Sequence, residues 1–278
     1  RPMTPAPAAP AAATGLTQSA AAEPLSTQPE QRAQLANDVA TLDFSSRGAA
    51  LSAVTLGDYR SKLAKESPPI VLDFSSRRAL AYTGLPGLGE GQDYQLTADA
   101  GGRKLVAERR TAQGLRLVRT IELGERYLLN ISDEFINESG APLALPDFAI
   151  QTGPMQREAG HRDAAGFVTL GVDSLSPGGE DVMHWGSKLA KQFDLEREER
   201  SLAKLPVRID RRPEMKSEAV DWVAAKNKYF VQILTPEDGA ASLTLHVARE
   251  LAAAEAGRPR PGKSAGLSPE ASSCCGRR

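Results

Sequence analysis

Apolar and polar residues alternate in short segments from about residue 39 to residue 250. The clearest segment places four apolar residues on one side of a two-residue period: Leu115, Leu117, Ile121 and Leu123. Arg116, Thr120 and Glu122 fall on the opposite side, while Val118 and Arg119 break the pattern, one on each face. After Gly124-Glu125-Arg126, a second run shares one face through Tyr127, Leu129, Ile131 and Phe135. This arrangement predicts an antiparallel hairpin of two long strands.

Several other segments show strand-like alternation or short apolar runs. We expect strands at 49–56, 69–74, 144–151, 166–171, 205–210, 222–234 and 242–247. Many short strands at close spacing favour an all-β sandwich of antiparallel sheets. Residues 186–204 differ, because they are rich in Lys, Glu, Arg and Leu, and they predict one short helix at a sheet edge.

Composition divides the chain into three parts. Residues 1–36 are dominated by Ala, Pro, Thr and Gln, which predicts an unstructured linker. We expect a folded β domain over residues 37–250 and a disordered tail over 251–278. The first residue is Arg1 rather than Met, so we interpret the sequence as an excerpt of a longer protein.

The charge balance and the apolar runs bear on the class of partner. The formal net charge is −1 with a pI near 6.4, so the basic footprint of a nucleic-acid-binding protein is missing. No apolar run approaches the ~18–20 residues of a membrane span, and we expect the 278 residues as written to be soluble. The two cysteines, Cys274 and Cys275, are adjacent in the tail, so the domain needs neither a disulfide nor a thiolate metal site.

Candidate chemistry is sparse. Glu158, His161 and Asp163 lie in one loop, but nearby arginines disfavour a bound cation. His184 precedes Trp185 and suggests a sugar-binding surface as an alternative to a loop histidine. His246 with Glu250 would be the general acid and base of a mutarotase-like enzyme, provided that they converge in one cleft. Because no nucleophile or metal motif accompanies these residues, we predict no catalytic, cofactor-binding or metal-binding residues.

Two further features need a structural interpretation. The glycine-rich segment 84–91 is interrupted by Pro86 and lacks the strand–helix context of a phosphate loop, so we interpret it as a flexible connection between sheets. The pentapeptide Asp-Phe-Ser-Ser-Arg occurs at 43–47 and again at 73–77. Two copies do not make a repeat array, and we expect two strand ends with similar turn chemistry.

Segments 42–56, 127–140 and 222–236 each carry a short motif, and together they resemble the periplasmic domain of YidC-type membrane protein insertases. The first is 42–56, where Gly48 precedes an apolar strand, and the second is 127–140, a strand that ends in Asn137-Glu138-Ser139-Gly140. The third is 222–236, which reads Trp-Val-Ala, then Tyr229-Phe230 and finally Pro236. We expect the aromatic residues of this third segment, together with Ile233, to include buried anchors.

The resemblance implies a β-supersandwich similar to the sheets of galactose mutarotase. It also implies a location on the periplasmic side of the bacterial inner membrane, as a spacer or docking module that assists insertion of nascent membrane proteins. Subunits of the secretion translocon are further implied partners. The family's membrane-embedded groove, with its functional arginine, has no counterpart in these residues, so no site residue carries over. The alternative is a mutarotase-like carbohydrate-binding or sugar-epimerising protein, since one fold hosts many functions.

Overall fold

The fold was analysed in a computed structural model. It describes residues 14–15, 25–64, 66–155, 171–179, 182–184, 210–211, 219–237, 241–242 and 247–248. All regular secondary structure in these ranges is β-strand, and none of them contains a helix. The prediction of an all-β fold with antiparallel sheets is therefore confirmed. The helix expected at 186–204 lies outside the described residues.

The chain divides into two compact units. One comprises the described residues of Arg1–Asp173 and Val223–Thr235, and the other those of Ser174–Trp222 and Pro236–Arg278. The first unit contains two of the three four-stranded sheets of the described residues, which we call the large sheets, and almost all of the described core. In the described parts of the chain, no helix is long and apolar enough to cross a membrane.

The first sheet has the strand order β2-β3-β4-β5 and is antiparallel throughout. Its strands are β2 (Arg32–Ala36), β3 (Ala40–Ser45), β4 (Ala50–Arg60) and β5 (Pro69–Asp73). The register between β3 and β4 shifts between Asp43 and Phe44, where a bulge bends the strand. The expectation that residues 1–36 lack regular structure is wrong at its C-terminal end, because Leu35 of β2 is fully buried.

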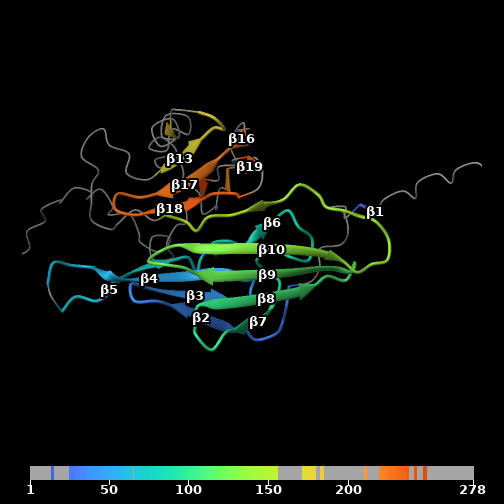
Figure 1. The fold of residues 1–278 in the computed structure, drawn as a ribbon, viewed down its shortest axis with the longest axis horizontal. Helices are drawn as coiled ribbons and strands as arrows, with labels where there is room; N and C mark the ends of the chain where they lie inside the picture. Colours follow the sequence, from blue (N-terminus) through green and yellow to red (C-terminus); the bar gives the residue numbers. More distant parts are fainter. Residues whose placement is uncertain are drawn as a thin grey trace, which may run out of the picture. The chain divides into compact units, whose positions relative to one another are not determined.

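The second sheet has the order β10-β9-β8-β7 (Figure 1). Its strands are β7 (Gln95–Ala98), β8 (Lys104–Arg110), β9 (Leu115–Leu123) and β10 (Leu129–Asn137). The pairing of β9 with β10 runs without interruption from Leu115↔Asn137 to Leu123↔Leu129, which confirms the predicted hairpin. Side chains along β9 alternate between buried and partly exposed, as a period of two requires.

The core lies between these two sheets. One apolar cluster combines Leu35, Leu42 and Phe44 of the first sheet with Leu105 and Ile121 of the second. A second cluster contains Leu85, Leu88 and Tyr94 from the connection between β6 and β7, packed on Leu115 and Leu117. Two antiparallel sheets that bury apolar faces against one another form a sandwich.

Short strands make up the rest of the described structure. In the first unit, β1 (Thr14–Gly15) pairs with β11 (Leu143–Ala144), and β6 (Tyr82–Thr83) pairs with β12 (Ala149–Ile150). The others are β13 (Gly171–Leu175), β14 (Val182–His184), β15 (Asp210–Arg211), β16 (Ala219–Val220), β19 (Ala241–Ser242) and β20 (Val247–Ala248). The strands β17 (Trp222–Lys226) and β18 (Val231–Leu234) form an antiparallel hairpin.

Several expected strands differ from the observed ones. The segment 144–151 is two short strands, separated by residues that include Pro146, which has no backbone donor for a ladder. The segment 222–234 is a hairpin rather than one strand, because Asn227 accepts backbone hydrogen bonds from Tyr229 and Phe230 and closes a turn. Most of 166–171, 205–210 and 242–247 lies outside the described residues.

Gly48 makes the turn that precedes β4, as the sequence predicts. Its φ is +74°, and a Cβ there would lie 2.9 Å from the backbone Cα of Glu90. We expect Gly48→Ala to destabilise the fold by about 1–3 kcal/mol, because it adds a clash to a left-handed conformation. The urea dependence of amide exchange in β9 measures the loss.

Gly102 is the matched control for Gly48. Its φ is +63°, but no atom lies within 4 Å of the position of a Cβ. Gly102→Ala therefore reports the conformational cost alone and should destabilise the fold less than Gly48→Ala. Equal losses for the two variants would show that the approach of Glu90 does not matter.

Candidate functional site

The described residues do not show whether the three histidines of the sequence lie close together. His161, His246, Glu158, Asp163 and Glu250 lie outside them, as do Cys274 and Cys275. His184 is the last residue of β14, and the structure describes its backbone only. Among the described residues, no group of three or more His, Cys, Asp or Glu side chains is arranged to hold a metal ion. The predicted absence of catalytic residues remains a prediction.

The glycine-rich connection 84–91 is packed rather than loose. Leu85 and Leu88 are buried in the second apolar cluster. The backbone carbonyls of this segment accept hydrogen bonds from the Tyr94 hydroxyl, at 2.8 Å to Leu88, and from Arg109 Nε, at 2.6 Å to Gly87. The interpretation as a flexible connection is therefore wrong, since the two leucines join the segment to the core.

Arg119 is the largest fully buried side chain of the described core. It projects from the core face of β9 and forms a two-point ion pair with Asp133 of β10. Arg119 Nε lies 2.7 Å from Asp133 Oδ1, and Nη2 lies 2.9 Å from Oδ2. Paired geometry of this kind is what allows an arginine and a carboxylate to remain charged inside a protein.

The remaining donors of Arg119 bind two backbone carbonyls in unusual conformations. Nη1 donates to Leu80 O at 2.7 Å and to Ala49 O at 3.3 Å. Ala49 and Leu80 have φ values of +47° and +69°, which are uncommon for residues with a side chain. Arg119 therefore ties β9 to two strained turns, each of which carries a conformational cost of about 1–3 kcal/mol.

Tyr82 completes this buried polar cluster. Its hydroxyl donates to Asp133 Oδ2 at 2.5 Å, and the Arg119 guanidinium carbon lies 4.7 Å from the centre of its ring. Burial, followed by the negative charge of Asp133, raises the pKa of Tyr82 well above its ordinary value, so the hydroxyl remains a donor. Burial by itself lowers the pKa of Arg119. The hydrogen bonds and the negative charge of Asp133 outweigh it, so the pKa of Arg119 lies above its ordinary value.

Sequence analysis assigned no role to Arg119 or Asp133. The signal was present, because Arg119 occupies the core side of the alternating β9 pattern. Asp133 is its cross-strand partner in the observed register and shares a face with Ile131 and Phe135. The Arg119–Asp133 pair has a structural role, because Arg119 donates its hydrogen bonds to groups inside the protein: Asp133, Ala49 and Leu80.

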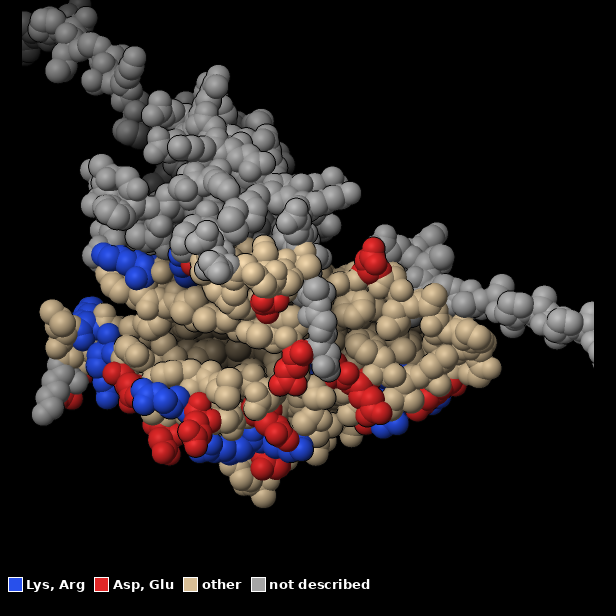
Figure 2. All heavy atoms as spheres, turned by 45° about the horizontal axis from the view of Figure 1, so that its top comes forward, with Lys and Arg blue, Asp and Glu red and all other residues tan. Residues whose placement is uncertain are grey.

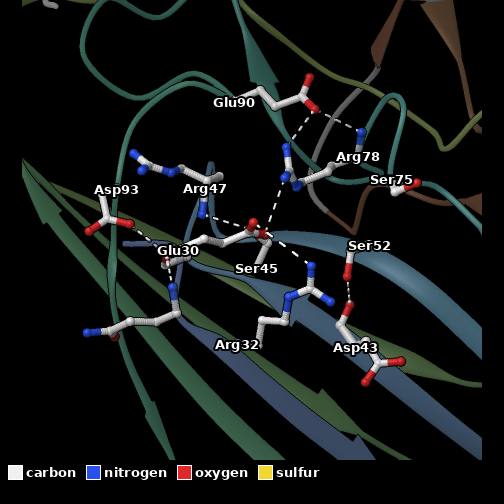
Figure 3. Close-up of polar contacts among 12 residues, drawn as sticks. Glu30, Arg32, Asp43, Ser45, Arg47, Ser52, Ser75, Arg78, Glu90 and Asp93 are labelled. Carbon is white, nitrogen blue, oxygen red and sulfur yellow. Dashed lines mark hydrogen bonds and ion pairs between the residues drawn. The ribbon is translucent and has the colours of Figure 1, made fainter. Parts of the chain in front are cut away.

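A second polar cluster surrounds Arg78 near the start of the first sheet (Figure 3). Arg78 forms ion pairs with Glu30 at 3.2 Å and with Glu90 at 3.3 Å. Ser45 Oγ donates to Glu30 Oε1 at 2.6 Å, and Ser46 Oγ donates to Asp93 Oδ1 at 2.6 Å. Each of its three carboxylates, Glu30, Glu90 and Asp93, has an ion-pair or hydrogen-bond partner within the protein.

Acidic and basic side chains are mixed on the face of the described part that Figure 2 shows. Figure 2 shows acidic and basic side chains interspersed along the lower rim, with other residues forming most of the area above it. This distribution agrees with the formal net charge of −1. It gives no single-sign surface of the kind that steers a nucleic acid or another highly charged partner.

Three aromatic side chains form a cluster at the solvent boundary of the first unit, which we call the aromatic patch: Tyr59, Tyr127 and Phe230. Ring centres lie 6.3 Å apart for Tyr59 and Tyr127, and 5.8 Å apart for Tyr59 and Phe230. Tyr59 and Tyr127 are 45% and 40% exposed. Leu128 and Tyr229, next to the patch in the chain, are exposed as well.

The aromatic residues of 222–234 are not the buried anchors that the sequence predicts. Trp222 and Phe230 are only partly buried, while Tyr229 and Ile233 are 51% and 58% exposed. The buried residues of this segment are small: Ala224 and Ala225. The reason is the hairpin, whose turn brings Tyr229 to the surface and whose strand β18 exposes Val231 and Ile233 on one side.

The exposed aromatic patch is a candidate binding surface. The described polar clusters are internally paired, and the exposed aromatic and aliphatic side chains are suited to contact with apolar groups. Binding of this type needs no convergent acid, base or nucleophile.

Comparison with known families identifies the chain. The family model of the YidC periplasmic domain matches residues 32–261, more than half of the 278 residues. The match begins at the first residue of β2 and includes both large sheets and the β17–β18 hairpin. A search of curated proteins found no match. The chain therefore belongs to the YidC periplasmic domain family.

Proposed function

We propose that this chain is the periplasmic spacer and docking module of a membrane protein insertase, and that it assists the insertion of nascent membrane proteins. The family match supports an extramembrane domain associated with an insertase of the bacterial inner membrane. The docking role rests on one structural observation, the exposed aromatic patch. Translocon subunits are the alternative partners of the same surface.

The chemistry of the patch suits an apolar segment of a nascent chain. Tyr59 and Phe230 meet edge to face, at an interplanar angle of 87°, and this arrangement leaves ring surface available to a partner. The adjoining β18 presents Val231 and Ile233, which are 54% and 58% exposed. Aromatic and aliphatic side chains that lie in contact at a surface mark interaction sites more often than isolated ones do.

Photo-crosslinking in the intact insertase tests the docking role. A photoreactive phenylalanine analogue replaces Tyr229, which is exposed beside the patch, and a stalled nascent membrane protein serves as the probe. We expect crosslinks from position 229, reduced at least threefold by Phe230→Ser, because that variant removes an aromatic ring from the patch. Crosslinked products are quantified by mass spectrometry.

The control position for this experiment is Thr97. It is exposed on β7, on the second sheet, and no exposed aromatic residue adjoins it in the chain. We expect few crosslinks to the nascent chain from position 97. Equal crosslinking from positions 97 and 229 would contradict the docking role, and crosslinks from 229 to a translocon subunit alone would assign the patch to that partner.

A further inference from the structure

The segment before the first sheet is held against the domain although its composition is that of a linker. Residues 25–31 contain Pro29 and no regular strand, yet several contacts fix them. Ser26 N donates to Gly91 O at 3.3 Å, and the side chain of Leu25 lies against the Cα of Gly91. We call residues 25–31 the strap.

The C-terminal half of the strap makes the tighter contacts. Gln31 N donates to Ser46 Oγ at 2.9 Å, and Ser46 N donates to Gln31 O at 2.9 Å. The guanidinium of Arg47 donates to the carbonyl of Gln28. These bonds join the strap to the turn that follows β3. Ser45, the last residue of β3, and Ser46 in the turn are fully buried.

Glu30 is the only acidic residue of the strap, and the ion pairs of the strap are made by its carboxylate (Figure 3). Its carboxylate accepts from Ser45 Oγ at 2.6 Å and from Arg78 Nη2 at 3.2 Å, and lies 4.0 Å from Arg32. The Ser45 hydrogen bond and the charges of Arg78 and Arg32 hold the pKa of Glu30 below its ordinary value, although burial opposes this shift. The side chains of Glu30 and Arg78 are 28% and 20% exposed.

Arg78 is itself anchored on the far side from the strap. It pairs with Glu90 through its guanidinium, and its backbone N donates to the same carboxylate at 3.1 Å. Gln151 Nε2 in turn donates to Arg78 O at 2.8 Å. Glu30 therefore binds a preorganised cation, which lowers the entropic cost of the contact.

We propose that the strap is a latched part of the domain, with the Glu30 carboxylate as the latch that holds residues 25–31 on the turn following β3. Release of the latch would free residues 25–31 from this turn and from Gly91. This inference concerns the fold and holds whether or not the aromatic patch docks a partner.

Amide hydrogen exchange of the 278-residue chain tests the latch. In the wild type, we expect the amide of Gln31 to exchange slowly, because it is hydrogen-bonded to a buried serine. Glu30→Lys should increase exchange in 26–31 at least tenfold, because it places a cation against Arg78 and Arg32. Glu30→Gln should increase it by a smaller factor, since an amide retains a hydrogen-bond acceptor for Ser45.

Two controls distinguish release of the strap from loss of the fold. Glu66→Lys makes the same charge change at an exposed position before β5 and should leave exchange in 26–31 unchanged. Exchange in β9 should also remain at its wild-type rate in Glu30→Gln. Fast exchange of the strap in the wild type, or unchanged strap exchange in both Glu30 variants, would overturn the proposal.

Discussion

Arg119→Met should destabilise the first unit by about 3–5 kcal/mol, the cost of removing one partner from a buried ion pair. Asp133, whose side chain is only 12% exposed, would be left with the Tyr82 hydroxyl as its remaining described partner. The carbonyls of Ala49 and Leu80 would also lose their shared donor. The free energy of unfolding can be measured from the urea dependence of amide exchange in β9, which reports on this unit.

A double variant separates the cost of losing the ion pair from the cost of leaving Asp133 buried without Arg119. Arg119→Met with Asp133→Leu removes both charges, and we expect it to recover at least about 1 kcal/mol relative to Arg119→Met alone, as apolar replacement of buried pairs does. Lys104→Met is the matched control on the same sheet. Its partner Glu122 is 2.7 Å away, but the two side chains are 48% and 51% exposed, so the expected cost is below about 1 kcal/mol.

The prediction is tested by comparing the stability losses of Arg119→Met and Lys104→Met. A loss for Arg119→Met no greater than that for Lys104→Met would show that the buried cluster contributes little to stability. Because the chain has two units, a single global unfolding midpoint is not used, and the β9 amides serve as the local readout.

Phe44→Ala should destabilise the same unit by about 3–5 kcal/mol, because it leaves a cavity between the two sheets. Phe44 is fully buried in the first apolar cluster, where it meets leucines of both sheets. Phe74→Ala should fall in the same range, since Phe74 is 2% exposed and its ring lies against the Cα of Gly153. The urea dependence of β9 amide exchange again gives the free energy.

Tyr229→Ala provides the contrast among aromatic residues. Tyr229 is 51% exposed at the tip of the β17–β18 hairpin, so its removal should change stability by no more than about 0.5 kcal/mol. A loss at Tyr229 equal to that at Phe44 would contradict the placement of Tyr229 at the surface. It would instead support the sequence-based expectation that the hairpin aromatics are core anchors.

Local patterning predicted the central hairpin well. The alternation along 115–123 and 129–135 depends only on which side chains are apolar, and the turn at 124–126 is encoded by a glycine and two charged residues. The same reasoning failed at β2, where a polar stretch with a single buried leucine gave too weak a signal. It failed again at 222–234, because an apolar run does not reveal where a hairpin turns.

The repeated pentapeptide separates what the sequence determines from what the fold decides. Both copies end a strand, at Ser45 in β3 and at Asp73 in β5, and both bury their phenylalanine. Turn chemistry differs, because Ser75 N donates to Asp73 Oδ1, whereas Asp43 accepts from Gln34 across the sheet. Ser45 and Ser46 are buried beneath the strap, while Ser75 and Ser76 are exposed.

The sequence by itself determined the β class, the central hairpin and the family, because periodicity and short motifs are local properties. Tertiary structure decided the roles of individual polar residues. Arg119 is an exception to the alternating pattern in the sequence, and becomes a buried tie only because Asp133, Leu80 and Ala49 meet it across the fold. Glu30 likewise belongs to a linker by composition, and is fixed only because Ser45 and Arg78, distant in sequence, lie beside it. Long-range pairing of this kind depends on register and on sheet packing, which no single segment encodes.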